Sequence, residues 1–398
     1  MFLTLLKSIM SYLMNTYARL PVTFVRGEGV WLMDEAGNRY LDALAGVAVN
    51  GLGHAHPALV KAVCDQAQQL IHCSNIYQVQ RQEELAEKLC QLSGMDKVFF
   101  CNSGCEANEA AIKIARLYGH GKGIDTPTII VMEKSFHGRT MATLTATGNR
   151  KVQAGFEPLL SGFVRVPYND VEAVRQVALH NPDVVAVMVE PIEGEGGIAI
   201  PDAAYLAQLR EICDAHGWLL MLDEVQTGIA RTGAWFAFQH AGIVPDVMSL
   251  AKGLGSGVPI GACVARGAAA EVFHPGNHGS TFGGNPLACA AGLATLQAVV
   301  DQDLLNHVQQ IGADIVSGLE RELAGVAGIK SIRGLGMMIG VELDRPCAEL
   351  VKLALAQHLL INVTADSVVR LVPPLVMSAE EAALLVNKLS AVIREFLK

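Results

Sequence analysis

Residues 246–257 read "DVMSLAKGLGSG", an apolar run that ends at Lys252 and continues directly into a glycine-rich turn. A short run that is apolar throughout is typical of a strand covered on both faces. Similar runs recur between residues 95 and 265, and helical patterns such as 104–118 and 203–216 separate them. This alternation predicts an α/β fold with a mostly parallel sheet. Its expected strands are "KVFF", "TIIVME", "VVAVMVEPI", "WLLMLDEV", "DVMSLAK" and "GACVA".

The two ends of the chain are expected to form a second, smaller α+β unit. After residue 290, an Ala/Leu-rich helical stretch leads to the strand-like runs "GIKSIRGLGMMIGVEL" and "VVRLVPPLVM". The glycine-punctuated N-terminal run "VRGEGVWLMDEAGNRYLDA" is expected to join them. We therefore predict a large domain at 60–297 and a small domain made of 1–59 and 298–398.

Composition excludes several classes of protein. The chain has 398 residues, of which 51% are hydrophobic and 17% charged, so it can bury a large core and is not disordered. Its net charge of −9, with no cluster of Lys and Arg, argues against nucleic acid or an anionic membrane as the main partner. Nine scattered cysteines form no C-x-x-C pair, which predicts a reduced, cytoplasmic protein without a zinc site.

The first nine residues, "MFLTLLKSI", are too short to span a bilayer and are followed by no small-residue cleavage site. Met10 opens a second plausible start of translation. We interpret residues 1–9 as an upstream extension of the reading frame, and we expect their removal to leave activity unchanged.

Charged residues end three of the apolar runs: Glu190, the adjacent pair Asp223 and Glu224, and Lys252. Ligands of open α/β sheets bind beyond the carboxyl ends of the strands, so one pocket would hold these residues. Taken singly, a strand-end lysine is usually a solvated charge. Together, an amine of lowered pKa can bond to a carbonyl cofactor, and a buried carboxylate can pair with a protonated pyridine nitrogen. Pyridoxal phosphate requires both groups.

A phosphate site is expected in "CNSGCEANEAAIKIARLYG", where a strand, the turn Ser103-Gly104-Cys105 and a helix follow one another. The free amides and the dipole of a helix N-terminus favour an anion. Ser103 to Glu106 also has the S-x-x-E spacing of a capping box, which many helices carry for stability alone. Both interpretations remain open on the sequence.

The motifs "NSGCEANEAAIKIAR", "FHGRTMATL", "EPIEGEGG", "LDEVQTGIARTG", "LAKGLGSGVPIGA" and "GSTFGGNPLACA" resemble those of the class III pyridoxal-phosphate aminotransferases. The resemblance runs from about residue 17 to the C-terminus, with the motifs in family order. The stretch "HPGNHGSTFGGNPLACA" is most similar to the acetylornithine aminotransferases. The resemblance implies fold-type I, with a seven-stranded, mostly parallel sheet covered by helices and a smaller α+β domain.

The resemblance also implies roles around the cofactor. Lys252 would bind it covalently and shuttle the proton between the substrate and the cofactor, while Asp223 would pair with the pyridinium nitrogen. Gln226 would lie near the ring hydroxyl, and Phe136 would stack on the ring, although a core aromatic is the alternative. Thr281 would reach the phosphate bound by a neighbouring subunit, which implies a homodimer. The remaining expected cofactor contacts are Ser103, Gly104, Cys105, His137 and Glu190.

Substrate binding is expected to depend on two arginines, because planar guanidinium groups suit carboxylates. By resemblance, Arg139 would bind the substrate carboxylate. Arg370 would bind the second carboxylate of glutamate, and Glu195 would neutralise it when a substrate has only one. Ser280 would touch an acylated substrate. The alternative for either arginine is a structural ion pair.

The implied reaction exchanges an amino group between N2-acetyl-L-ornithine and 2-oxoglutarate, giving N-acetyl-L-glutamate 5-semialdehyde and L-glutamate in arginine biosynthesis. Alternative substrates are succinylornithine, N-succinyl-LL-diaminopimelate, ornithine and 4-aminobutyrate, and a mutase or a non-catalytic protein of this fold remains open. A nicotinamide-dependent dehydrogenase is disfavoured because no G-x-G-x-x-G follows the first strand.

Three positions depart from the family pattern. Cys105 replaces a usual Thr, and its thiol is a weaker hydrogen-bond donor. Ala230 and Ser256 replace glycines, and we expect little effect because both are small. "GHAHP" at 53–57 offers two histidines at a metal-like spacing, but we interpret it as a structural turn and expect no metal.

Overall fold

The computed structural model describes residues 12–398. The interpretation of residues 1–9 as an upstream extension therefore lies outside the described residues. Within the described part of the chain, no helix has the length and apolar character needed to cross a membrane.

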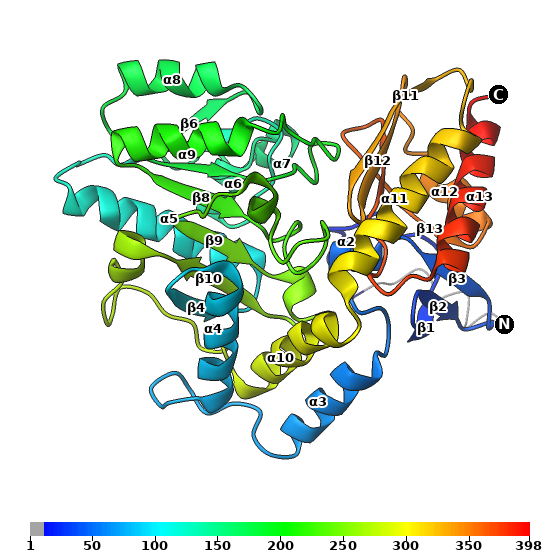
Figure 1. The fold of residues 1–398 in the computed structure, drawn as a ribbon, viewed down its shortest axis with the longest axis horizontal. Coiled ribbons are helices and arrows are strands. Elements are labelled where there is room, and N and C mark those ends of the chain that lie inside the picture. Colours follow the sequence, from blue (N-terminus) through cyan, green and yellow to red (C-terminus); the bar gives the residue numbers. More distant parts are fainter. Residues whose placement is uncertain (1–11) are drawn as a thin grey trace.

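A seven-stranded sheet lies at the centre of the larger part of the molecule (Figure 1). Only its second strand, β10, runs antiparallel to its neighbours. The seven strands and the mostly parallel arrangement are confirmed. In spatial order they are β4 (Lys97–Cys101), β10 (Gly261–Ala265), β9 (Val247–Leu250), β8 (Leu219–Asp223), β7 (Val184–Val189), β5 (Thr128–Met132) and β6 (Phe163–Val166).

Helices cover both faces of this sheet, which explains why its inner strands are apolar throughout. Every residue of β5, β7, β8, β9 and β10 is buried. One face packs on α5 (Gly104–Gly121) and α6 (Met141–Ala146), and the other packs on α4 (Gln80–Ser93), α8 (Val171–His180), α9 (Tyr205–His216) and α10 (Pro286–Asp301). The helices predicted at 104–118 and 203–216 are confirmed as α5 and α9.

Two four-stranded sheets form the second part of the molecule, seen on the right of Figure 1. Their shared core also contains α11 (Leu304–Glu322), α12 (Leu350–Ala356) and α13 (Ala379–Phe396). Strand β3 pairs with β13, so the N-terminal strands share a sheet with a strand from the C-terminal part. The strands are β1 (Phe24–Glu28), β2 (Trp31–Asp34), β3 (Arg39–Asp42) and β13 (Leu359–Leu360) in one sheet, and β11 (Ile329–Leu335), β12 (Met338–Leu343), β15 (Val368–Leu371) and β14 (Asn362–Thr364) in the other.

The described residues also form several other elements. They are α2 (Ala45–Ala48), α3 (Pro57–Ala67), α7 (Arg150–Gln153) and the 3₁₀ turns η1 (Ala237–Ala241), η2 (Lys252–Leu254) and η3 (Gly267–Glu271).

Both residues that replace family glycines adopt a backbone conformation that glycine favours. Ala230 has φ +67° and Ser256 has φ +45°, both in the left-handed region that glycine adopts most easily. The expectation that these substitutions matter little rested on side-chain size, and it overlooked this conformational cost. Ser256 gains a compensating contact, because its hydroxyl accepts a hydrogen bond from the backbone N–H of Leu52 at 2.9 Å.

Candidate active site

Three adjacent strands bring charged residues to one edge of the large sheet. Glu190 follows β7, Asp223 ends β8, and Lys252 begins η2 just after β9. Lys252 has φ +43° and is partly buried, and its amine makes no hydrogen bond or ion pair with any described residue. Burial lowers the pKa of Lys252 to about 8. At neutral pH an appreciable fraction of this amine is therefore the uncharged nucleophile.

Neighbouring charges also act on the pKa of Lys252. After burial, the positive charge of Arg370 lowers it further, whereas the negative charges of Asp223, Glu190 and Glu195 oppose the shift. These groups therefore lie close enough to Lys252 to share one electrostatic environment. The structure thus brings Glu190, Asp223 and Lys252, which the sequence analysis assigned to one pocket, to the same edge of the sheet.

The carboxylate of Asp223 is buried and fixed by three donors. Its Oδ2 accepts hydrogen bonds from Nδ2 of Asn108 at 2.7 Å and Nδ1 of His137 at 2.8 Å. Its Oδ1 accepts one from the backbone N–H of Val225 at 3.0 Å. Asn108 is oriented in turn, since its Oδ1 accepts from the hydroxyl of Ser249 at 2.5 Å. These three donors hold the carboxylate in one orientation.

Sequence reasoning missed Asn108 and Ser249. Asn108 lies inside the quoted helix motif, where its position does not stand out, and Ser249 lies inside an apolar strand. A polar residue within a strand that is otherwise apolar was the available signal, because a buried hydroxyl needs a hydrogen-bond partner.

Glu190 connects two loops that border the site. Its Oε1 accepts from the backbone N–H of Phe136 at 2.8 Å, and its Oε2 accepts from the N–H of Gly194 at 3.1 Å. Burial raises the pKa of Glu190 to about 7, against the favourable charge of His137. Glu224 does not share this role: its carboxylate binds the hydroxyl of Thr227 and the N–H of Phe238.

Arg370 and Glu195 form the contact that the resemblance implied. Nη1 of Arg370, which is only 1% exposed, lies 2.7 Å from Oε1 of Glu195. The same nitrogen lies 3.4 Å from the side-chain oxygen of Gln226, so the pair reaches the loop after Asp223. The side chain of Glu195 is 37% exposed. The arginine is thus fixed inside the protein, whereas the glutamate lies at the edge of solvent.

The turn before α5 serves as a helix cap. Oγ of Ser103 accepts from the backbone N–H of Glu106 at 3.2 Å, which confirms the capping interpretation without testing the phosphate one. A Cβ added at Gly104 would lie 2.7 Å from Cγ1 of Val225, so only glycine lets the helix start this close to the end of β8. Sγ of Cys105 lies 3.2 Å from Oγ1 of Thr143.

The "FHGR" segment places an aromatic ring and a cation side by side. Phe136 is half-buried, and the guanidinium carbon of Arg139 lies 5.6 Å from the centre of its ring. Arg139 is exposed and forms no ion pair with any described residue. Within residues 12–398, Arg139 therefore does not serve as a member of a structural ion pair.

Ser280 and Thr281 lie in an exposed loop before α10. Oγ of Ser280 accepts from Nδ2 of Asn102 at 3.2 Å and from the N–H of Gly283 at 3.0 Å. Thr281 is exposed, and its hydroxyl makes no hydrogen bond within residues 12–398.

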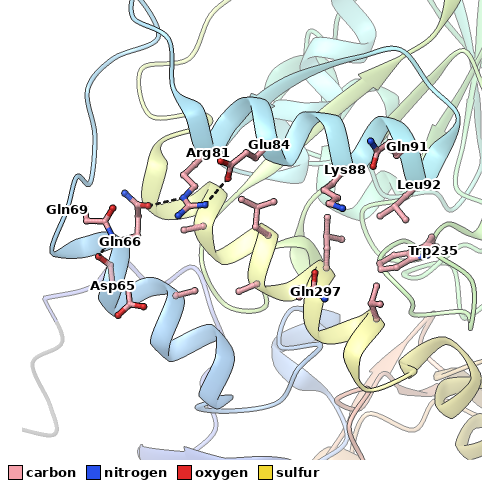
Figure 2. A pocket seen from close by; sticks show the side chains of 16 residues that line it. Asp65, Gln66, Gln69, Arg81, Glu84, Lys88, Gln91, Leu92, Trp235 and Gln297 are labelled. Carbon is pink, nitrogen blue, oxygen red and sulfur yellow. Dashed lines mark hydrogen bonds and ion pairs between the residues drawn. The ribbon is translucent and has the colours of Figure 1, made fainter.

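Two cavities differ in how they relate to this site. A cavity of about 590 Å³ borders it and is lined by Glu195, Gly196, Lys134 and Arg150 among others. A second, of about 520 Å³, lies between α3, α4 and α10 and contains none of the predicted site residues; Trp235 and the Arg81–Glu84 ion pair line it (Figure 2). The second cavity is therefore not the site of the predicted chemistry.

The described residues contain no group of three or more side chains suited to hold a metal ion. In "GHAHP", Nε2 of His54 lies 2.8 Å from Oδ2 of Asp42, which fits the structural interpretation of this turn.

The donor set fits pyridoxal phosphate. Among the described residues, the amine of Lys252 has no partner, the buried carboxylate of Asp223 is held by donors, and Nε2 of His137 is buried without a hydrogen bond. The close approach at Gly104 brings the free amides of the α5 N-terminus next to the end of β8. Lys252 would bond to the carbonyl of the cofactor, Asp223 would pair with its ring nitrogen, and the amides of α5 would bind its phosphate.

Comparison with known proteins identifies the family. Residues 12–393 match the family model described as aminotransferase class III. The chain is 63% identical to the acetylornithine aminotransferase of Nitrosomonas europaea, over 98% of this chain and 99% of that protein. Structural relatives include the N-acetylornithine aminotransferase of Stenotrophomonas maltophilia, with a TM-score of 0.83, 36% identity, and 96% and 97% of the two chains covered.

The structure of a second relative contains the cofactor. The ornithine aminotransferase of Toxoplasma gondii has a TM-score of 0.93 and 35% identity over 100% of this chain and 96% of its own, and its structure is described as having partial occupancy of pyridoxal phosphate at the active site. Enzymes of this class depend on that cofactor. The family model matches almost the whole chain, and one relative is 63% identical to it. The chain therefore belongs to the class III aminotransferases and takes pyridoxal phosphate as its cofactor.

Proposed function

We propose that this protein transfers the amino group of N2-acetyl-L-ornithine to 2-oxoglutarate, giving N-acetyl-L-glutamate 5-semialdehyde and L-glutamate. The observation that carries the proposal is the Lys252 amine, unpaired among the described residues, near the Glu195–Arg370 ion pair. Transfer between these substrates needs both a reactive amine and an adjustable carboxylate site. The name of the 63% identical relative supports acetylornithine as the amino donor. A role in arginine biosynthesis would follow.

The chain's own residues would hold the cofactor and move one proton. The cofactor supplies an electron sink for the pair released when the reacting carbon loses its proton. Lys252 would bind the cofactor carbonyl and then carry the proton to and from the carbon that bears the amino group. Asp223 would keep the ring nitrogen protonated, while Gln226 and His137 orient the ring. Phe136 would cover one ring face.

The phosphate would be held at the start of α5. Backbone amides of Gly104 and Cys105 would donate to it, because the first amides of a helix have no intrahelical acceptor. The side chain of Ser103 already caps the helix, so its contribution would come from its position in the turn. Glu190 would act indirectly, by fixing the backbone of Phe136.

Substrate exchange would use the two arginines differently. Arg139, which is exposed and has no ion pair within residues 12–398, would bind the carboxylate that both amino donors share. Arg370 would bind the second carboxylate of glutamate, which requires Glu195 to leave it. With acetylornithine, Glu195 would stay on Arg370 and cancel its charge. Ser280 would face the acyl group.

We also propose a homodimer in the cytoplasm. The loop before α4 and the loop before α10 are joined, because Nδ2 of Asn75 donates to the carbonyl oxygens of Ser280 and Gly283 at 2.9 Å. Large apolar side chains are exposed on both loops: Leu70, Ile71, Ile76, Tyr77 and Phe282. A second copy would cover this patch and would place Thr281 at the partner's phosphate. All nine cysteines are free, which suits a reducing compartment.

A turnover assay tests the proposed function. Protein loaded with pyridoxal phosphate is expected to give its highest kcat/KM with N2-acetyl-L-ornithine, measured beside succinylornithine, N-succinyl-LL-diaminopimelate, ornithine and 4-aminobutyrate. A higher value with any of these four would reassign the substrate within the class. Absence of transfer from every amine and from glutamate would refute the aminotransferase assignment.

A further inference from the structure

Strand β14 contacts both members of the Glu195–Arg370 pair. Asn362 stands directly opposite Arg370 in the β14–β15 ladder, and its Oδ1 accepts a hydrogen bond from Nε of Arg370 at 3.1 Å. Two residues further, the hydroxyl of Thr364 donates to the backbone carbonyl of Glu195 at 2.5 Å and lies 3.4 Å from Oε2 of its carboxylate. Alternate residues of a strand share one face, so a single short strand holds the two partners together.

The surroundings of the pair indicate which partner moves. Arg370 is buried and is held by Asn362 as well as by Glu195. The side chain of Glu195 is more than a third exposed and lines the cavity of about 590 Å³. Lys134 and Arg150 line the same cavity, and both are cations exposed to solvent. A carboxylate that leaves Arg370 therefore has space and positive charge beside it.

We propose that Asn362 and Thr364 are positioning residues that set the balance between two positions of Glu195, one on Arg370 and one in the adjacent cavity, and thereby set the preference between glutamate and an acylated diamine. This inference rests on the proposed function, since it assigns control to a switch used by that reaction. Neither residue is required to touch the reacting atoms.

The two residues act in different ways. The Thr364 hydroxyl favours the position on Arg370, because it fixes the peptide of Glu195 and lies 3.4 Å from Oε2 when the carboxylate is on Arg370. The Asn362 side chain fixes the guanidinium in both positions, because its neutral carbonyl does not compete with a substrate carboxylate for charge. Removing the Thr364 hydroxyl should release Glu195, whereas a negative charge at position 362 should neutralise Arg370 permanently.

Two substitutions with opposite expected effects test the proposal. Thr364→Val removes the hydroxyl at nearly constant shape and should raise the ratio of kcat/KM for glutamate to kcat/KM for N2-acetylornithine by about threefold, the ordinary net value of one hydrogen bond. Asn362→Asp places a carboxylate at Nε of Arg370 and should lower that ratio by about tenfold, because charged partners interact more strongly. A general loosening of the hairpin would not move the ratio in opposite directions.

Matched controls come from the same hairpin. Thr364→Ser keeps the hydroxyl and should keep the wild-type ratio. Ser367→Ala removes a hydroxyl that makes no hydrogen bond within the described residues, and it should also leave the ratio unchanged. If Thr364→Val fails to fold, Thr364→Ala removes the same hydroxyl and should raise the ratio in its place.

The proposal is overturned if either Thr364→Val or Asn362→Asp leaves the ratio unchanged, or if both shift it in the same direction. That result is distinct from failure of the proposed function, which would appear in the wild-type protein as an absence of turnover with both substrates and would remove the switch along with the reaction.

Discussion

At the scale of the residue, the chain of hydrogen bonds from Ser249 through Asn108 to Asp223 gives the sharpest prediction. Asn108→Ala removes one of the three donors to Asp223, and hydrogen bonds to charged groups contribute about 1.5–3 kcal/mol. We expect kcat to fall at least about tenfold and the absorption band of the bound cofactor to shift, because the ring nitrogen is less firmly protonated. Ser249→Ala breaks only the bond to Asn108 and should cause a smaller loss. Wild-type kcat and an unshifted band in Asn108→Ala would rule out this role.

The lowered pKa of Lys252 predicts a pH dependence for cofactor binding. Only the neutral amine attacks a carbonyl, and in the folded protein this amine loses its proton near pH 8 rather than 10.5. The rate at which cofactor-free protein takes up pyridoxal phosphate should therefore rise from pH 7 and level off about one unit above pH 8. A rate that continues to rise beyond pH 10 would indicate an ordinary, solvated lysine.

At the scale of the element, helix α5 is positioned by its first residue. In Gly104→Ala, the new methyl group would meet Val225 at 2.7 Å and push the helix start away from β8, so the affinity for pyridoxal phosphate should fall about tenfold or more. Gly121→Ala, at the other end of α5, has open space around it and should leave the affinity unchanged. Equilibrium binding measured by absorbance distinguishes the two. Equal affinities in both variants would mean that the helix start does not form the phosphate site.

The elements also show what the sequence can and cannot predict. The buried inner strands and α5 follow from their apolar patterns, whereas β6 was not predicted, because "FVRV" lies at the sheet edge and carries an exposed arginine. The Glu195–Arg370 contact joins residues 175 positions apart, so no local pattern contains it; only resemblance implied it. Asn108 and Ser249 were missed because their partners come together only in the folded sheet. The division at residues 60 and 297 remains our proposal.

At the scale of the whole molecule, the exposed apolar loops predict the assembly. Phe282→Ser should weaken the proposed dimer, because this side chain is 61% exposed and would lose its contact with a second copy. Leu179→Ser alters a similarly exposed apolar side chain on α8, away from those loops, and should leave assembly unchanged. In sedimentation velocity, Phe282→Ser should sediment as a monomer, whereas Leu179→Ser and the wild-type protein should sediment as dimers. A monomeric wild-type protein would exclude the dimer and the shared role of Thr281.

The covalent bond between Lys252 and the cofactor is the central claim, and one labelling measurement tests it most directly. Protein loaded with pyridoxal phosphate is reduced with borohydride, digested and mapped by mass spectrometry. We predict one phosphopyridoxyl group per chain, located on the peptide that contains Lys252, and none in Lys252→Ala, which should also lack visible absorbance and turnover. A label on another lysine, or an unlabelled wild-type chain, would contradict the account.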